Sequence, residues 1–312
     1  MKEYVLNYYP KFKCVADKCK HTCCAGWEIS IDKNSLDEYM NCDSNFLSAL
    51  KKGINYKKSK FKVDKFKRCA FLNADNLCEI IINLGEKSLC QVCKDHPRFR
   101  SFFDDRTETG IGFCCEEAAR IILSFQDRID LVTVGDDKGQ TELDFNQKNI
   151  LEFREKALDT LQDRTVNIND RIDRLLTLCN ASIRDLDFGR ILKTFLSFER
   201  LDKTWTNRLK SIKNFTKKST EEYLSIMAEQ FLVNCLYRHL SDAEDTMWVR
   251  ARTIACVISW WIINHVVLQE KTDEKDLLEL VVDVVRAFSA EVEYSKNNLD
   301  KLFSFCYNFI KI

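Results

Sequence analysis

The cysteines of this 312-residue chain are unevenly distributed, and this distribution constrains the fold more than any other feature. Eleven of the fifteen cysteines lie within the first 115 residues, several of them one to four positions apart. The other four are widely spaced, in a region whose apolar residues recur at helical intervals. The sequence therefore predicts an N-terminal part organised around thiol chemistry and a C-terminal part that is not.

Charge and composition exclude few classes of protein but favour helices. The 48 basic residues balance the 48 acidic ones, so nothing in the overall charge indicates a nucleic acid or an anionic membrane as a partner. Only two prolines and eight glycines occur, which favours long helices over a turn-rich sandwich or barrel. We therefore expect a mainly α protein.

The start of the chain and its most apolar segment indicate the compartment. The first ten residues, MKEYVLNYYP, lack the basic region and apolar run of a signal peptide. The most apolar segment, residues 254–268, is shorter than the roughly 20 residues that cross a bilayer and contains Ser259, Asn264 and His265. We expect a buried helix there, with Trp260, Trp261 and His265 in the core, and a cytoplasmic protein whose thiols are reduced or bound to metal rather than paired in disulfides.

The predicted organisation is an irregular, cysteine-rich, metal-binding module over residues 1–133, packed on a helical bundle over residues 145–312. Residues 134–144 are the predicted linker. Helical spacing predicts helices over 34–51, 115–125, 277–288 and 299–310, whereas residues 27–32 alternate like a short strand at most. The run from Lys51 to Arg68 carries nine basic residues and one acid, which is typical of a solvated loop or of a binding strip for an acidic partner.

The cysteine spacing indicates metal ligation. Cys19-x3-Cys23 and Cys90-x2-Cys93 have the spacing of the paired thiolates that hold zinc, and iron–sulfur clusters also take four cysteines. More thiols are present than four, which indicates two centres or one centre with additional thiols nearby. From the adjacent pairs 23–24 and 114–115 we expect one ligand each. Gly26 stands where a radical S-adenosylmethionine motif needs its third cysteine, which argues against that chemistry.

Three segments together resemble a known family. CVADKCKHTCCAGWEISID, CAFLNADNLCEI and LCQVCKDHPRFRSFFDDRTETGIGFCCEEAARIIL, within residues 4–125, are similar to the flagellin lysine-N-methylases, part of a wider group with a zinc- or iron-chelating cysteine domain. The resemblance implies a bacterial enzyme that transfers methyl groups from S-adenosylmethionine to flagellin lysines and carries an iron–sulfur centre, of the 4Fe–4S type. The cysteines that match by position are Cys14, Cys19, Cys23, Cys24, Cys69, Cys78, Cys90, Cys93 and Cys115.

The methyl donor has no recognisable site of the usual kind. Gly110 and Gly112 form the one glycine pair before a predicted helix, and no doubly wound pattern surrounds them. A site on the cluster itself is one hypothesis. Arg98 and Glu116 are the candidate cofactor-binding residues, Arg98 to hold a carboxylate. In the alternative, Arg98 pairs with an acid such as Glu116 or Asp95.

Other residues near the cysteines have structural and functional interpretations. His96 stands in a turn fixed by Pro97, or acts as a ligand or proton relay. Arg106 and Glu108 are expected to form a structural ion pair. Aromatic and acidic residues are available to line a lysine channel, although aromatic residues near a metal core usually serve packing; these are Tyr8, Tyr9, Trp27, Asp32 and Glu116. Two other functions remain open, a zinc-stabilised module that binds a protein partner and a redox cluster protein.

Overall fold

The computed structural model describes residues 2–136, 141–181, 187–212 and 219–310, and within these ranges the chain forms two compact units. The helical unit contains residues 1–12, 98–114 and 118–312, and the cysteine-rich unit contains residues 13–97 and 115–117. The cysteine-rich unit is thus shorter than the predicted module of 1–133, because several segments of that module form a β-sheet that belongs to the helical unit.

Those segments form a four-stranded sheet that the sequence did not lead us to expect. The strands are β1 (Lys2–Leu6), β4 (Arg98–Phe102), β5 (Arg106–Ile111) and β6 (Leu131–Asp136), in the order β4-β5-β1-β6. Strand β1 pairs in parallel with β5 and antiparallel with β6, whereas β4 and β5 form a hairpin. The predicted linker therefore begins inside β6, and its residues 137–140 lie outside the described residues.

The helices of the helical unit follow the predicted pattern. They are α5 (Glu116–Leu123), α6 (Phe145–Leu161), α7 (Ile168–Leu178), α8 (Phe188–Leu196), α9 (Lys203–Ser211), α10 (Ser225–His239), α11 (Thr246–Glu270), α12 (Leu277–Phe288) and α13 (Lys296–Tyr307). Two residues of α5, Glu116 and Glu117, belong to the cysteine-rich unit. The predicted helices over 115–125, 277–288 and 299–310 are confirmed.

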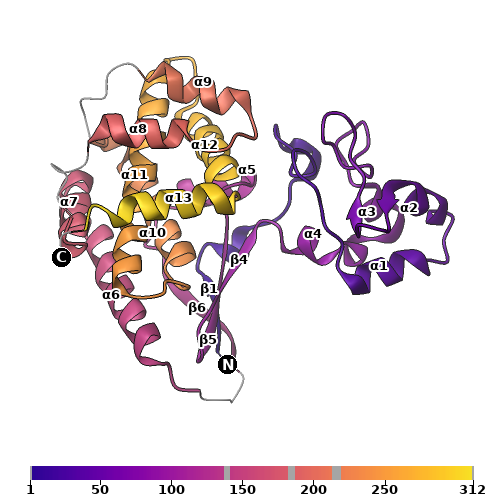
Figure 1. The fold of residues 1–312 in the computed structure, drawn as a ribbon, viewed down its shortest axis with the longest axis horizontal. Helices are drawn as coiled ribbons and strands as arrows, with labels where there is room; N and C mark the ends of the chain where they lie inside the picture. Colours follow the sequence, from indigo (N-terminus) through magenta and orange to yellow (C-terminus); the bar gives the residue numbers. More distant parts are fainter. Residues whose placement is uncertain (1, 137–140, 182–186, 213–218, 311–312) are drawn as a thin grey trace. The chain divides into compact units, whose positions relative to one another are not determined.

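Helix α11 lies at the centre of the bundle, where it contacts α6, α7, α9, α10, α12 and α13 (Figure 1). It is long and apolar enough to cross a membrane by length and composition, but 89% of its most apolar window is buried inside the protein. Trp260 and Trp261 are fully buried, and the ring of His265 bonds through Nδ1 to the Trp261 carbonyl oxygen at 2.7 Å. The prediction that these residues form the core is confirmed.

Buried polar contacts attach the sheet to the bundle. Glu108 on β5 pairs with Arg154 on α6 at 2.7 Å, and Ser101 on β4 donates a hydrogen bond to the carbonyl oxygen of Tyr237 on α10. Arg106 pairs instead with Asp105 at 2.8 Å. The predicted Arg106–Glu108 ion pair is therefore wrong. Side chains two positions apart in a strand lie on the same face, so Arg106 and Glu108 could in principle approach each other. Each is instead paired with a different residue, Arg106 with Asp105 and Glu108 with Arg154.

The cysteine-rich unit has short elements around one small apolar cluster. They are α1 (Lys33–Met40), α2 (Leu47–Gly53), β2 (Ile54–Asn55), β3 (Lys60–Phe61), α3 (Glu79–Leu84) and α4 (Gln91–Asp95). The prediction of a single helix over 34–51 is wrong. Two helices, α1 and α2, occupy this segment, and the turn formers Asp43, Ser44 and Asn45 lie between them. The basic run includes the β2–β3 hairpin, with Phe61 buried and Phe66 exposed, so it is not simply a loop.

Gly53 at the end of α2 gives the first testable prediction. A Cβ added there would lie 2.5 Å from Cζ of Phe71, whose ring is buried against Phe46 and Phe61. Gly53→Ala should therefore destabilise the cysteine-rich unit by about 1–3 kcal/mol through overpacking, measured by amide exchange of residues 13–97 in urea. Phe71→Leu should restore part of the loss in the double variant. Gly189→Ala in α8, where the nearest atom is at 3.4 Å, should not destabilise its own helical unit to the same extent; an equal loss there would contradict this explanation.

Candidate metal centre

All nine cysteines predicted as metal ligands fall within the cysteine-rich unit. Eight lie in residues 13–97, and Cys115 belongs to the short segment 115–117 that joins this unit. Its neighbour Cys114 belongs to the helical unit, where its thiol and the Tyr294 hydroxyl are hydrogen-bonded. The fold therefore brings the distant Cys115 to the other thiols and separates the two members of the 114–115 pair.

A first group of thiols consists of Cys14, Cys19, Cys23 and Cys115. The Glu116 carboxylate accepts hydrogen bonds from the backbone N–H groups of Lys20 (3.0 Å) and His21 (3.2 Å), which holds Cys115 beside the loop between Cys19 and Cys23. Burial raises the pKa of Cys19 to about 12, and the nearby Cys115 and Cys14 thiols add to the shift. The pKa of Cys23 is raised by its hydrogen bond to Cys24 and by burial, and again by Cys115 and Cys14.

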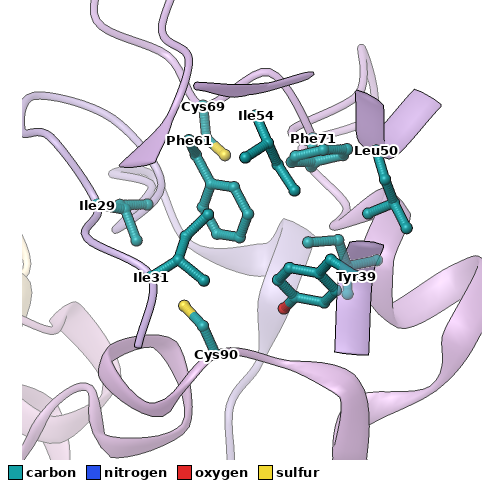
Figure 2. Close-up of a cluster of buried hydrophobic side chains, with 10 residues drawn as sticks. Ile29, Ile31, Tyr39, Leu50, Ile54, Phe61, Cys69, Phe71 and Cys90 are labelled. Carbon is teal, nitrogen blue, oxygen red and sulfur yellow. The ribbon is translucent and has the colours of Figure 1, made fainter. Parts of the chain in front are cut away.

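A second group consists of Cys24, Cys69, Cys78, Cys90 and Cys93. All five pack in or against the apolar cluster that includes Ile31, Tyr39 and Phe61. Figure 2 shows the sulfur atoms of Cys69 and Cys90 among these side chains. The backbone N–H of Cys69 donates to the Cys24 carbonyl oxygen at 2.8 Å, so the two cysteine-bearing segments lie side by side. The second group thus forms part of the core of its unit.

Backbone amides stabilise the thiolate form of three cysteines in the second group. Burial raises the pKa of Cys69 to about 12, and a hydrogen bond from the amide of residue 71 opposes this shift. Burial also raises the pKa of Cys78, and hydrogen bonds from the amides of residues 80 and 81 oppose it. Cys78 and Cys90 stand at the N-caps of α3 and α4, where free amides favour negative charge. The pKa of Cys90 is lowered, first by the Cys93 thiol that donates to it and then by the Cys93 amide.

The adjacent residues Cys23 and Cys24 belong to different groups. The Cys23 thiol donates a hydrogen bond to Cys24, and this bond is the main reason that the pKa of Cys24 falls to about 7; Thr22 and the positive charge of Arg68 lower it further. Cys42 also packs against the apolar cluster, but it is not among the cysteines that match the family by position. Thiolates of this kind are donors that soft and borderline metals accept, so the chemistry of both groups fits a bound metal.

Asp32 connects α1 to the Cys90–Cys93 turn. Its Oδ1 accepts from the Ser35 amide at 3.0 Å as the N-cap of α1, and its Oδ2 accepts from the Gln91 amide at 2.8 Å. We predict that Asp32→Ala destabilises the cysteine-rich unit by about 1–2 kcal/mol, whereas Asp32→Asn, which keeps the cap oxygen, loses less than half of that. Amide exchange of residues 33–40 and 91–95 measures both. Equal losses for the two variants would show that the carboxylate charge, rather than the two bonds, matters.

The two candidate cofactor-binding residues lie in different units. Arg98, in the helical unit, donates from Nε to the Tyr9 hydroxyl at 2.7 Å and lies over the rings of Tyr9 and Phe12. Glu116, in the cysteine-rich unit, is buried and bonded to residues 20 and 21 as described. Their proposed role toward a cofactor stays a prediction.

The aromatic candidates have structural roles in the described residues. Tyr8 is fully buried and donates its hydroxyl hydrogen to Asn234, which makes it part of the core of the helical unit. Trp27 is 37% exposed, donates from Nε1 to the Cys23 carbonyl oxygen at 2.9 Å, and stacks on His96. Trp27 therefore lies beside Cys23 of the first thiol group, and His96, which stacks on Trp27, follows Cys93 of the second group by three residues.

Comparison with known proteins identifies the family through the other half of the chain. Residues 116–308, more than half of the sequence, match the model of the FliB lysine N-methylase C-terminal domain. This chain belongs to the FliB lysine N-methylase family. The predicted resemblance is thus confirmed, although it rested on the cysteine motifs and the match lies almost wholly in the helices. No solved structure matches the chain.

Curated relatives of the FliB family cover parts of the chain. It is 24% identical over 170 residues, 51% of the chain, to the lysine-N-methylase of Salmonella typhimurium, and to the same extent to that of Salmonella choleraesuis. It is 25% identical over 142 residues, 42% of the chain and 84% of the relative, to the flagellar biosynthetic protein FliU of Salmonella muenchen. The matched region spans only 41% of the length of the two lysine-N-methylases.

Proposed function

We propose that this protein transfers methyl groups from S-adenosylmethionine to lysine side chains of flagellin, and that its N-terminal thiols bind iron–sulfur centres. The observation that carries the first part is the match of the helical half to the FliB lysine N-methylase C-terminal domain. The name of the FliU relative, a flagellar biosynthetic protein, supports a flagellar substrate.

The thiol groups support the second part of the proposal. Cys14, Cys19, Cys23 and Cys115 would hold one centre, and four of the five thiols of the second group would hold another. Amides of residues 71, 80, 81 and 93 already favour the thiolate form that a metal needs. When bound, an iron–sulfur centre supplies iron, which binds a ligand or carries an electron.

The target lysine has to lose a proton before its amine can accept a methyl group, since an ammonium ion has no free electron pair. A desolvated environment lowers the pKa of a lysine amine and so favours the neutral form. The target lysine amine therefore lies in an apolar or aromatic environment when it accepts the methyl group.

The test starts from anaerobic purification of the full chain. Iron and acid-labile sulfide with absorption near 400 nm are the expected result, and Cys90→Ser should lose part of both, whereas Cys42→Ser should not. Incubation with labelled S-adenosylmethionine and flagellin, followed by mass spectrometry of lysine-containing peptides, tests the transfer. Zinc without iron would overturn the iron–sulfur part and favour an interaction module; an intact cluster with unlabelled flagellin would overturn the methylation and favour a redox protein.

A further inference from the structure

The core of the helical unit contains a second set of metal-binding side chains, far in sequence from the N-terminal thiols. Cys235 and His239 on α10 and Glu293 after α12 each offer one donor atom, and these atoms lie within 4.8 Å of one another. All three residues are buried, with exposed fractions of 2%, 8% and 7%. Buried groups of this polarity require partners, and one thiol, one imidazole and one carboxylate are all donors that zinc accepts.

Two features of the helices direct these side chains to one point. Cys235 and His239 are four residues apart on α10, which places them on the same helical face. Glu293 ends the π-helical segment Ser289–Glu293, which interrupts the helical path between α12 and α13. A π-helical turn shifts the following side chains around the helix axis and is often found at functional sites. Here it carries the Glu293 carboxylate to the imidazole of His239.

A shell of further contacts fixes the donors in place. The Ser289 hydroxyl donates to Oε2 of Glu293 at 2.5 Å, and Nη1 of Arg238 lies 3.7 Å from the same oxygen. Nη1 of Arg252 donates to the backbone carbonyl oxygen of His239 at 2.8 Å. The imidazole of His239 and the ring of Phe303 form a T-shaped contact with their centroids 5.8 Å apart. Such outer contacts hold metal ligands in position.

We propose that Cys235, His239 and Glu293 bind a zinc ion within the helical unit. The two charges of zinc balance one thiolate and one carboxylate, so the buried site becomes electrically neutral apart from Arg238. Binding releases the thiol proton of Cys235 to solvent. The neutral imidazole of His239 coordinates the zinc ion through the ring nitrogen that carries no proton. Three protein donors leave the fourth position of a tetrahedral ion for a water molecule or for the other oxygen of Glu293.

The competing interpretation is a metal-free network in which Glu293 accepts hydrogen bonds from His239 (2.7 Å) and Ser289. The two interpretations differ at Cys235. The network does not need a thiol at this position, whereas the zinc site does. Cys179, directly after the end of α7, provides a control because its thiol is fully buried and is not among the three donors.

The first experiment measures zinc in the full chain, expressed with zinc and iron both supplied, by elemental analysis per mole of protein. Cys235→Ser is expected to lower the zinc content by one equivalent, and Cys179→Ser to leave it unchanged, with circular dichroism showing that both variants are folded. The iron content should not change in either variant. Equal zinc in the wild-type protein and in folded Cys235→Ser would overturn the proposal in favour of the metal-free network.

A second measurement needs no variant and so does not depend on the folding of Cys235→Ser. Cadmium-113 nuclear magnetic resonance of the cadmium-substituted wild-type chain separates sites by sulfur ligands, because each bound thiolate shifts the resonance downfield. A one-sulfur resonance, besides any from the N-terminal thiols, is expected. Its absence from a fully loaded protein would also overturn the proposal. Neither readout depends on methyl transfer, so failure of the methylation test leaves this site unaffected.

Discussion

Removal of metal is expected to unfold the cysteine-rich unit while the helical unit remains folded. The thiols of the second group are part of the only apolar cluster that we find among the described residues of that unit, with Cys69 and Cys90 fully or nearly fully buried. Without a metal, these thiols are poor substitutes for larger apolar side chains. In small metal-stabilised folds the binding free energy, about 10–16 kcal/mol for zinc-finger peptides, is the folding free energy.

Hydrogen exchange measured by mass spectrometry, before and after treatment with a chelator and a reductant under anaerobic conditions, gives the readout. Amides of residues 13–97 should lose most of their protection, and amides of α6 and α11, which carry none of the proposed metal ligands, should keep theirs. Cys90→Ser should reproduce part of the loss in the untreated protein, and Cys42→Ser should not. Full protection of residues 13–97 in the metal-free chain would mean that the apolar cluster suffices, and the metal would then have no structural role in this unit.

Substitution of Glu229 is expected to have the largest effect on the helical unit. The Glu229 carboxylate, on α10, is fully buried and accepts hydrogen bonds from Arg171 at 2.6 Å and from Arg164 at 2.7 Å. Arg171 is itself 4% exposed, whereas Arg164 reaches solvent. Glu229→Ala leaves the guanidinium of Arg171 buried, with the Leu161 carbonyl oxygen as its one remaining hydrogen-bond partner among the described residues. Loss of one member of a buried ion pair costs about 3–5 kcal/mol.

Urea denaturation followed by tryptophan fluorescence measures this effect, because four of the five tryptophans belong to the helical unit. The double variant Glu229→Leu/Arg171→Met should recover much of the loss, since it removes both buried charges. Lys156→Ala, which breaks the exposed pair with Glu152, should leave the free energy of unfolding almost unchanged. A loss below 1 kcal/mol for Glu229→Ala would show that Arg171 gains access to water when its partner is removed.

Helices were the most predictable part of this fold. Apolar residues at helical spacing identify α12 and α13, because one face of each helix packs on the bundle, and the mostly apolar segment 254–268 identifies the central helix α11. The sheet was not predictable in the same way. Strand β1 pairs in parallel with β5, which lies about a hundred residues later in the chain. The alternation of apolar and polar residues within a five-residue strand does not specify a partner at that distance.

The sequence by itself determined that the N-terminal part carries thiol chemistry, since cysteine spacing is local and metals require closely spaced donors. It also placed the chain in its family. Only the tertiary structure assigned Cys115 to the group of Cys14, Cys19 and Cys23, because hydrogen bonds from residues 20 and 21 to Glu116 bridge almost a hundred residues. The tertiary structure likewise brought Glu293 to Cys235 and His239. The spacing of Cys235 and His239 is visible in the sequence, but a π-helical turn more than fifty residues later supplies the third donor.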